Sequence, residues 1–278
     1  MQYLSNAHTH SIYCDGKDTP EEMVLEAIRR GYTSLGFSGH SYLPFDDPSD
    51  PWTMTPEKEK LYIREVSRLK EVYKDRITIY LGTELDSFSR IDLSPYDYYI
   101  GSVHMYQDPE TGKHYGYDGS TATFLKIYRE FFHEDELALA RHYYTQVAEH
   151  MATCKAPILG HYNLITKHNK ELHLIHEDEP AYKAIASEAL LAAAEHAVCV
   201  EVNTGAIARG RTDVPYPNRW MLQLLKEHHI PVILTCDCHD RSHLSDSYDL
   251  ALDILRDVGY TSLLTLGKHS LFEEIPLE

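Results

Sequence analysis

Short apolar runs of strand length alternate with longer segments of helical periodicity along almost the whole chain. The strand-like runs cover residues 4–7, 34–38, 77–82, 98–102, 157–160, 198–203, 232–235 and 262–266. The helix-like segments cover residues 20–30, 56–74, 121–132, 134–153, 180–196, 218–228 and 244–258. This alternation is typical of an α/β protein with a parallel sheet.

Capping residues mark the boundaries of one predicted helix clearly. No sequence signal indicates a boundary between domains. Thr19 and Glu22 form a capping-box pattern around Pro20, and Gly31 follows the last turn of the segment. No internal repeat, low-complexity tract or Pro/Ser-rich linker divides the chain, so we expect a single domain over residues 1–278. The turn-rich stretches 44–55 and 108–120 are expected to be loops at the rim of a site.

Composition narrows the functional classes. The 278-residue chain is 43% hydrophobic, which is enough for one large α/β core. Its formal net charge of −17 argues against an extended contact with nucleic acid phosphates. The chain has neither a signal-peptide pattern at its start nor an apolar run of membrane-spanning length, and its five cysteines suit a reducing compartment. We therefore expect a cytoplasmic protein with no nucleic acid or membrane partner.

Histidines and acids follow the carboxyl ends of six strand-like runs. These residues are His8 and His10, His40, Glu84, His104, His161, and Asp237 with His239. In parallel barrels and open sheets the carboxyl ends of the strands meet at one mouth. The chain contains 18 histidines, so one such residue carries little weight, but the recurrence at one end of successive strands predicts a site for several metal ions.

Residues 235–240, with the sequence TCDCHD, offer two alternative pairs of ligands. Cys236 and Cys238 would bind zinc as thiolates, whereas Asp237 and His239 would supply a carboxylate and an imidazole. Alternate residues at the end of a strand point to opposite faces, so only one pair can face the site. The ligands at the other strand ends favour Asp237 and His239, and the thiolate alternative stays open at this point.

The spacing of three other residues supports a site with more than one metal. His8 and His10 are two residues apart in an extended segment, so both rings point to the same side and can bind one ion. Glu84 has two carboxylate oxygens, which can bridge two ions at the short separation that two-metal hydrolysis uses.

Taken in order, the motifs resemble the polymerase and histidinol phosphatase (PHP) superfamily, and most closely its histidinol-phosphate phosphatases. The motifs are His8-Thr-His10-Ser11, Asp15-Gly16, His40, Glu84, Gly101-Ser-Val-His104, His161 and Asp237-x-His239. The resemblance covers essentially the whole chain. It implies an α/β fold with a distorted (β/α)7 barrel of parallel strands, helices outside, and a trinuclear metal centre at the carboxyl ends of the strands.

The resemblance implies nine ligands for three divalent ions, with zinc, iron and manganese as the candidate metals. The first ion would be held by His8, His10, Glu84 and Asp237, the second by Glu84, His104 and His161, and the third by Asp15, His40 and His239. Asp15 is assigned on the resemblance alone, because an Asp-Gly pair is more often a turn.

The resemblance implies an enzyme, a metal-dependent phosphoric monoester hydrolase that converts L-histidinol phosphate to L-histidinol and phosphate in histidine biosynthesis. Hydroxide between the first two ions is the expected nucleophile. Glu84, Asp237 and His239 are the candidate catalytic residues, the last two as groups that move protons. The alternatives are a PHP phosphoesterase for another small phosphomonoester or a nucleotide, and a non-catalytic metal-binding PHP module.

Substrate contacts are expected from basic residues and from the rim loops. Arg209 is the first candidate for binding phosphate and Arg211 the second. Lys167 is a third candidate, at a place where the family usually has arginine. The rim offers acidic and aromatic partners for the amine and imidazole of histidinol, namely Asp46, Asp47, Trp52, Tyr106, Tyr115, Tyr117 and Asp118. The sequence does not predict the oligomeric state.

Overall fold

The structure, a computed structural model, describes residues 3–45 and 52–277. Within these ranges a nine-stranded sheet runs in the order β1-β2-β3-β4-β7-β8-β9-β10-β11, beside a two-stranded sheet of β5 and β6. The strands are β1 (Ser5–Asn6), β2 (Ser34–Phe37), β3 (Thr78–Asp86), β4 (Tyr98–Ser102), β5 (Met105–Gln107), β6 (His114–Gly116), β7 (Ile158–Leu159), β8 (Cys199–Asn203), β9 (Val232–Thr235), β10 (Ser262–Leu266) and β11 (Phe272–Pro276). Neighbours in the large sheet are parallel, except β10 and β11.

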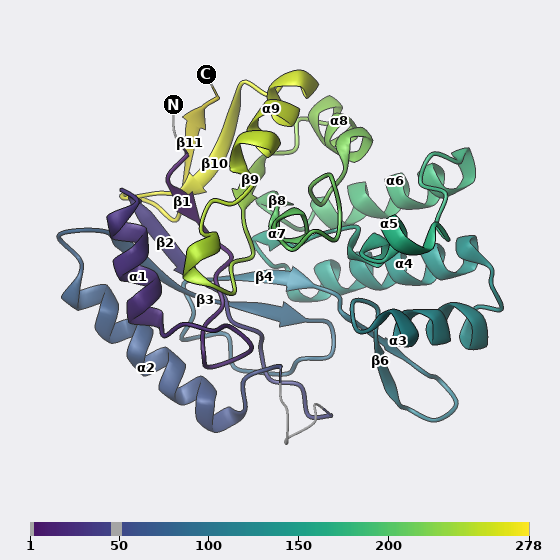
Figure 1. Ribbon diagram of the computed structural model, residues 1–278, viewed down its shortest axis with the longest axis horizontal. Coiled ribbons are helices and arrows are strands. Elements are labelled where there is room, and N and C mark those ends of the chain that lie inside the picture. Colours follow the sequence, from purple (N-terminus) through teal and green to yellow (C-terminus); the bar gives the residue numbers. More distant parts are fainter. Residues whose placement is uncertain (1–2, 46–51, 278) are drawn as a thin grey trace.

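Helices cover the outside of the large sheet. They are α1 (Pro20–Arg29), α2 (Pro56–Val72), α3 (Thr121–Lys126), α4 (Glu136–Cys154), α5 (Asn169–Leu172), α6 (Pro180–Ala194), α7 (Gly205–Ala208), α8 (Arg219–Glu227) and α9 (Tyr248–Val258). Figure 1 shows α1 and α2 on one side of the molecule, α8 and α9 along the top, and α4 and α6 on the opposite side. The expected α/β class, with parallel strands inside and helices outside, is confirmed.

The sheet curves until residues that follow β1 meet residues that follow β9. Thr9 and Cys238 form an isolated parallel bridge. In this bridge the His10 N–H donates to the Cys238 carbonyl oxygen at 2.9 Å, and the Cys238 N–H donates to the His8 carbonyl oxygen at 2.9 Å. These bonds join the end of β1, at one edge of the sheet, to the end of β9, in the curved arrangement expected of the distorted barrel that the resemblance implies.

Apolar side chains fill the interior of the curved sheet below its carboxyl end. The buried cluster consists of Ala7, Tyr98, Ile100, Ile158, Cys199, Ile233 and Leu266. Tyr98 crosses this space, and its hydroxyl donates to the Phe37 carbonyl oxygen at 3.2 Å. A Cβ atom at Gly36 would lie 2.2 Å from the Tyr98 hydroxyl oxygen, so glycine is required there. Packed side chains therefore fill the interior of the sheet below the carboxyl ends of its strands.

The capping signals produce the predicted start of α1. The Thr19 side chain accepts from the Glu22 N–H at 3.3 Å, and the Glu22 carboxylate accepts from the Thr19 N–H at 2.9 Å. Pro20 occupies the first turn and Gly31 follows the helix with φ +82°. The helix therefore ends where the sequence predicts, and the chain returns directly into β2.

Other boundaries differ from the predictions for identifiable reasons. The strand expected at 77–82 continues to Asp86, because residues 82–86 pair in register with β4. The helix expected at 121–132 is divided into α3 and a π-helical turn, Ile127–Phe131. The helix expected at 244–258 begins only at Tyr248, because Ser247 has φ +63°, outside the helical region.

Three strands, β5, β6 and β11, were not predicted. The loop expected at 108–120 contains β6, which pairs with β5 through a turn in which Gly112 has φ +70°. These strands are only three residues long, too short for a clear alternating pattern. The edge strand β11 has the sequence FEEIP and pairs with β10. It was not predicted because its two acids and its proline are uncommon inside strands.

Candidate metal centre

The side chains predicted as metal ligands converge at the carboxyl ends of the parallel strands. They comprise His8 and His10 after β1, Asp15 in the loop before α1, His40 after β2, Glu84 within β3, His104 after β4, His161 after β7, and Asp237 with His239 after β9. Neighbouring parallel strands therefore bring together residues that are far apart in the sequence.

Glu84 lies at the centre of this convergence, with its side chain only 1% exposed. Its Oε2 atom lies 3.1 Å from His8 Nε2 and 2.9 Å from His40 Nδ1. Its Oε1 atom lies 3.2 Å from His104 Nε2 and 2.7 Å from His161 Nε2. The two oxygens of one carboxylate thus face two different sets of histidines, as a ligand that bridges two ions must.

Asp237 lies between the histidines next to Glu84 and the more exposed His239. Its Oδ1 atom lies 3.2 Å from His10 Nε2, 3.7 Å from His8 Nε2 and 3.4 Å from His239 Nδ1. The backbone of Asp237 has φ +46°, a left-handed conformation that aspartate tolerates better than most residues. This turn directs the carboxylate toward the histidines immediately after β9.

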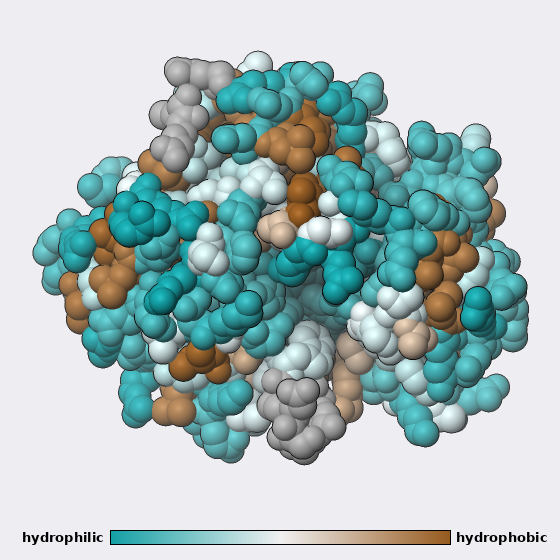
Figure 2. Space-filling view, viewed as in Figure 1, coloured by the Kyte–Doolittle hydropathy of each residue, from teal (hydrophilic) through white to brown (hydrophobic). Residues whose placement is uncertain are grey.

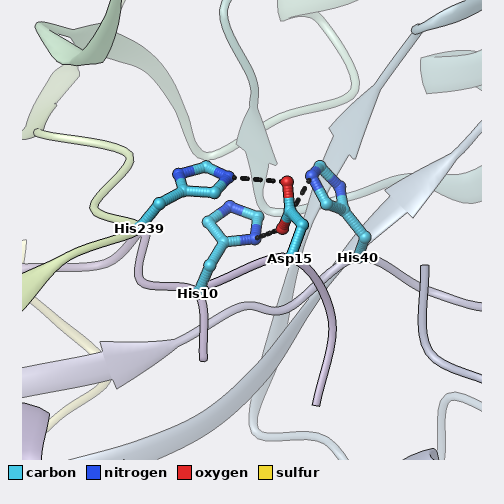
Figure 3. Close-up of side chains that lie close together, drawn as sticks. All are labelled: His10, Asp15, His40 and His239. Atoms are coloured by element: carbon cyan, nitrogen blue, oxygen red, sulfur yellow. Dashed lines mark ion pairs between the residues drawn. The ribbon is translucent and has the colours of Figure 1, made fainter. Parts of the chain in front are cut away.

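Asp15 is the centre of a second, more open set of ligands (Figure 3). Its Oδ2 atom lies 3.1 Å from His239 Nε2, and its Oδ1 atom lies 3.5 Å from His10 Nδ1 and 3.8 Å from His40 Nε2. The Asp15 side chain is 34% exposed, in contrast to the enclosed Glu84. The structure therefore brings Asp15 into the site, where the Asp-Gly pattern alone suggested only a turn.

Three groups of described residues have ligand atoms close enough together to hold a metal ion. They are His10, Asp15, His40 and His239; His8, His10 and Glu84; and His40, Glu84 and His104. These groups share His10, His40 and Glu84 and include neither His161 nor Asp237, so they overlap with the predicted assignment of ligands but do not reproduce it.

The state of the ligand atoms suits metal binding. Burial lowers the pKa of His10 to about 3, and charge on His239 and His40 acts in the same direction, so this imidazole is neutral. Its buried Nε2 atom has no hydrogen-bond partner among the described residues, although it lies 3.2 Å from the Asp237 carboxylate. Burial raises the pKa of Glu84, but His8, His40 and His104 outweigh this effect and hold its pKa well below the usual range.

Two acids behind the ligands were missed by the sequence analysis. The Asp86 Oδ2 atom accepts from the His104 N–H at 3.0 Å and lies 3.2 Å from His104 Nδ1. Glu201, on β8, lies with its Oε1 atom 2.5 Å from His8 Nδ1. Glu201 could have been found because it is an acid inside the otherwise apolar strand-like run 198–203, where a buried acid needs a polar partner. The same signal would have applied to Asp86 if the strand at 77–82 had been predicted to continue to residue 86.

The candidate ligands open into a cavity of about 570 Å³. Its lining includes Arg209, Arg211 and Lys167, the three basic residues predicted to contact phosphate. Figure 2 shows a hollow near the middle of the molecule, surrounded by mainly hydrophilic surface, close to the ends of β3 and β4 in Figure 1. A small polar molecule that entered this cavity would meet both the ligands and the basic side chains.

Arg209 is held against Asp237, one of the candidate ligands. Its Nη2 atom lies 3.0 Å from Asp237 Oδ2, and its Nη1 atom donates to the Asp237 carbonyl oxygen at 3.0 Å. Lys167 Nζ donates to the Asp118 carbonyl oxygen at 2.5 Å and lies 3.4 Å from its carboxylate. Tyr216, which the sequence analysis did not single out, also lines the cavity, and its buried hydroxyl has no partner among the described residues.

Of the residues proposed for the rim, some line the cavity and others pack in the apolar core. Trp52 lines the cavity, with its ring 4.7 Å from that of His40, and Asp118 also lines it. Tyr106 and Tyr117 are buried in the large apolar core and Tyr115 packs against it, so packing rather than the site explains these three tyrosines. Asp46 and Asp47 lie outside the described residues.

The cysteines of the TCDCHD segment belong to the apolar core. Cys236 and Cys238 are 2% and 1% exposed and lie in the cluster between the sheet and its helices. Among residues 3–45 and 52–277, the groups able to hold a metal contain no cysteine. The geometry therefore favours Asp237 and His239 over a thiolate site.

We expect that replacing Cys236 or Cys238 by alanine will leave the metal content unchanged, because these thiols pack rather than bind. Elemental analysis of the purified variants measures this directly, with the wild-type protein as reference. A loss of one ion per chain in either variant would restore the thiolate interpretation.

Residues 6–205 match the family model described as the PHP domain. The chain is 24% identical over 272 residues to the histidinol-phosphatase of Bacillus subtilis (strain 168), an alignment that covers 89% of this chain and 98% of that protein.

Two solved structures share the fold. HisK from Listeria monocytogenes superposes with a TM-score of 0.75 at 19% identity, covering 88% of this chain and 99% of that one. Histidinol phosphate phosphatase from Lactococcus lactis subsp. lactis Il1403, complexed with zinc, L-histidinol and phosphate, gives a TM-score of 0.71 at 21% identity and covers 96% of this chain and 98% of that one. Among the described residues, no helix combines the length and apolar character that a membrane crossing requires.

Proposed function

Because this chain belongs to the PHP domain family, whose model matches residues 6–205, we propose that it is a metal-dependent phosphomonoesterase acting on L-histidinol phosphate. The products would be L-histidinol and phosphate, in a step of histidine biosynthesis. The relative from Bacillus subtilis carries this activity in its name, and the Lactococcus structure contains both products. The observation that carries the proposal is Glu84, whose two oxygens face separate sets of histidines.

The proposed cofactors are three divalent ions, with zinc, iron or manganese as candidates. The nine predicted ligands would hold them, from His8 to His239. When bound, such ions supply Lewis acidity that activates water and neutralises phosphoryl charge. Asp237 and His239 lie beyond residue 205, where the family match ends, and still reach the same ligands, so we propose that residues 1–278 act as one domain. We also propose a cytoplasmic location.

Residues of this chain would divide the remaining tasks. Glu84 would fix the spacing of the two sets of histidines. The leaving alkoxide oxygen needs a proton, and Asp237 and His239, whose Oδ1 and Nδ1 atoms are 3.4 Å apart, are the proposed groups that hold and move it. Arg209, Arg211 and Lys167 supply positive charge to the cavity wall, where the phosphate dianion would bind.

A comparison of substrates tests the proposed function. We expect kcat/KM for L-histidinol phosphate to exceed that for other small phosphomonoesters and for nucleotides assayed on the same protein preparation. A higher kcat/KM for one of those compounds would assign the site to that substrate instead.

Replacement of Arg209 by methionine is expected to lower kcat/KM for the phosphomonoester by about 10- to 100-fold, the effect of losing charged hydrogen bonds worth about 1.5–3 kcal/mol. Part of the loss should appear in kcat, because Arg209 also holds the Asp237 carboxylate. The matched control is Arg219→Met, since Arg219 forms an exposed ion pair with Asp257 on the outer helices. Unchanged kinetics in the Arg209 variant would leave phosphate binding to Arg211, Lys167 or the ions.

A further inference from the structure

We propose that Glu201 is a positioning residue that keeps the proton of His8 on Nδ1, so that Nε2 of His8 is presented to a metal ion. The inference rests on the proposed metal site. It adds a residue that none of the predicted ligand sets contains, and it gives a function to the only acid on β8.

Glu201 is completely buried, at 0% exposure, and its two oxygens face four donors. The Oε1 atom lies 2.5 Å from His8 Nδ1 and accepts from the Thr235 hydroxyl at 2.7 Å. The Oε2 atom accepts from the His161 backbone N–H at 2.7 Å and from Asn203 Nδ2 at 3.2 Å. A buried carboxylate with this many donors is both satisfied and fixed in orientation.

Strand order explains why Glu201 reaches both histidines. Strand β8 lies between β7 and β9 in the sheet, and His161 follows β7 after one residue, Gly160. His8 approaches from the other side, because the bridge between Thr9 and Cys238 joins the end of β1 to the end of β9. Glu201 therefore connects the histidine predicted for the first ion to the backbone of one predicted for the second.

The chemistry of the contact fixes the proton on His8. An ionised carboxylate only accepts hydrogen bonds, so the ring nitrogen facing Glu201 must carry a hydrogen. The lone pair that a metal requires can then be offered only by Nε2, which lies 3.1 Å from Glu84 Oε2 and 3.7 Å from Asp237 Oδ1. Carboxylates that fix a ligating histidine in this way commonly contribute 10- to 100-fold to metal affinity.

Substitution by glutamine would reverse this arrangement with almost no change in volume. The backbone N–H of His161 can only donate, so the carbonyl oxygen of the new amide must face it. The amide NH₂ then faces Thr235 and His8. The threonine hydroxyl can rotate and accept, but the imidazole can accept at Nδ1 only by carrying its proton on Nε2, which points toward the metal ligands.

The test compares Glu201→Gln with wild type and with Glu177→Gln, a partly buried carboxylate that accepts from the Asn218 side chain and contacts no ligand. Metal-free protein is titrated with zinc by calorimetry, and ¹⁵N NMR determines whether His8 Nδ1 carries a proton, its signal being assigned by its loss in His8→Asn. We expect zinc to bind about 10- to 100-fold more weakly to Glu201→Gln, with unchanged affinity in Glu177→Gln. The Nδ1 proton should be present in wild type and absent in Glu201→Gln.

Equal zinc affinity and a retained Nδ1 proton in Glu201→Gln would overturn the inference. If that variant does not fold, wild type alone decides, because a His8 Nδ1 atom without a proton would contradict the proposed contact. A wild-type protein that shows the Nδ1 proton and binds zinc but does not hydrolyse histidinol phosphate would reject the proposed function and still support the role of Glu201.

Discussion

Replacement of Glu84 by glutamine is expected to lower kcat/KM for the phosphomonoester by roughly a thousand-fold or more, which corresponds to about 4 kcal/mol of transition-state stabilisation. Glutamine keeps the shape of the side chain but offers one oxygen in place of two. It can therefore serve only one of the two sets of histidines that Glu84 now faces. Metal content should also fall, because both proposed ions lose a charged ligand.

The fold should survive this substitution. Backbone bonds to β2 and β4 hold β3 in the sheet independently of the Glu84 side chain. Circular dichroism and thermal unfolding would establish that the variant is folded, and Glu177→Gln controls for the loss of a carboxylate elsewhere. Wild-type kcat/KM in a folded Glu84→Gln variant would remove Glu84 from the mechanism.

Removal of metal is expected to abolish turnover, and its return should restore it. The buried Nε2 atom of His10, which has no hydrogen-bond partner among the described residues, and the crowded carboxylates around it are arranged to bind cations. Chelation followed by gel filtration should give protein that retains less than about 1% of the starting rate, since the bound ions are the proposed source of activated water. Addition of zinc, manganese or iron(II) should then identify the metals that support activity.

Elemental analysis of the same samples in which turnover is measured shows whether the loss of activity follows the loss of metal. Full activity in protein shown to be free of metal would exclude the proposed chemistry. A fully metallated protein that hydrolyses no phosphomonoester would instead indicate a metal-binding module without catalytic function.

Much of the fold could be predicted because its signals are local. The capping pattern around Thr19 and Glu22 determines where α1 starts, and the apolar runs locate each strand of the large sheet except β11. Strand β3 was predicted too short because Glu84 and Asp86 have low strand propensity, and pairing with β4 overrides that preference. The β5–β6 hairpin was missed because its strands contain too few residues for a pattern.

The convergence of the candidate ligands was predictable to the extent that they follow strands. His40, His104 and His161 could be expected to lie together because the carboxyl ends of parallel strands converge. Glu201 and Asp86 could not be predicted, because their contacts with His8 and His104 depend on how distant segments of the chain pack together. Tyr216 was missed for the same reason, since its isolated bridge to Asn203 brings it to the cavity across more than ten intervening residues that include α7.

The proposed metal centre is tested most directly by anomalous diffraction from crystals of the metal-loaded protein, recorded at the absorption edge of the bound metal. We expect separate anomalous peaks on the two sides of the Glu84 carboxylate, one near His8 and one near His104, and a third near Asp15. An active protein whose anomalous map shows no peak within coordination distance of Glu84 would contradict this prediction.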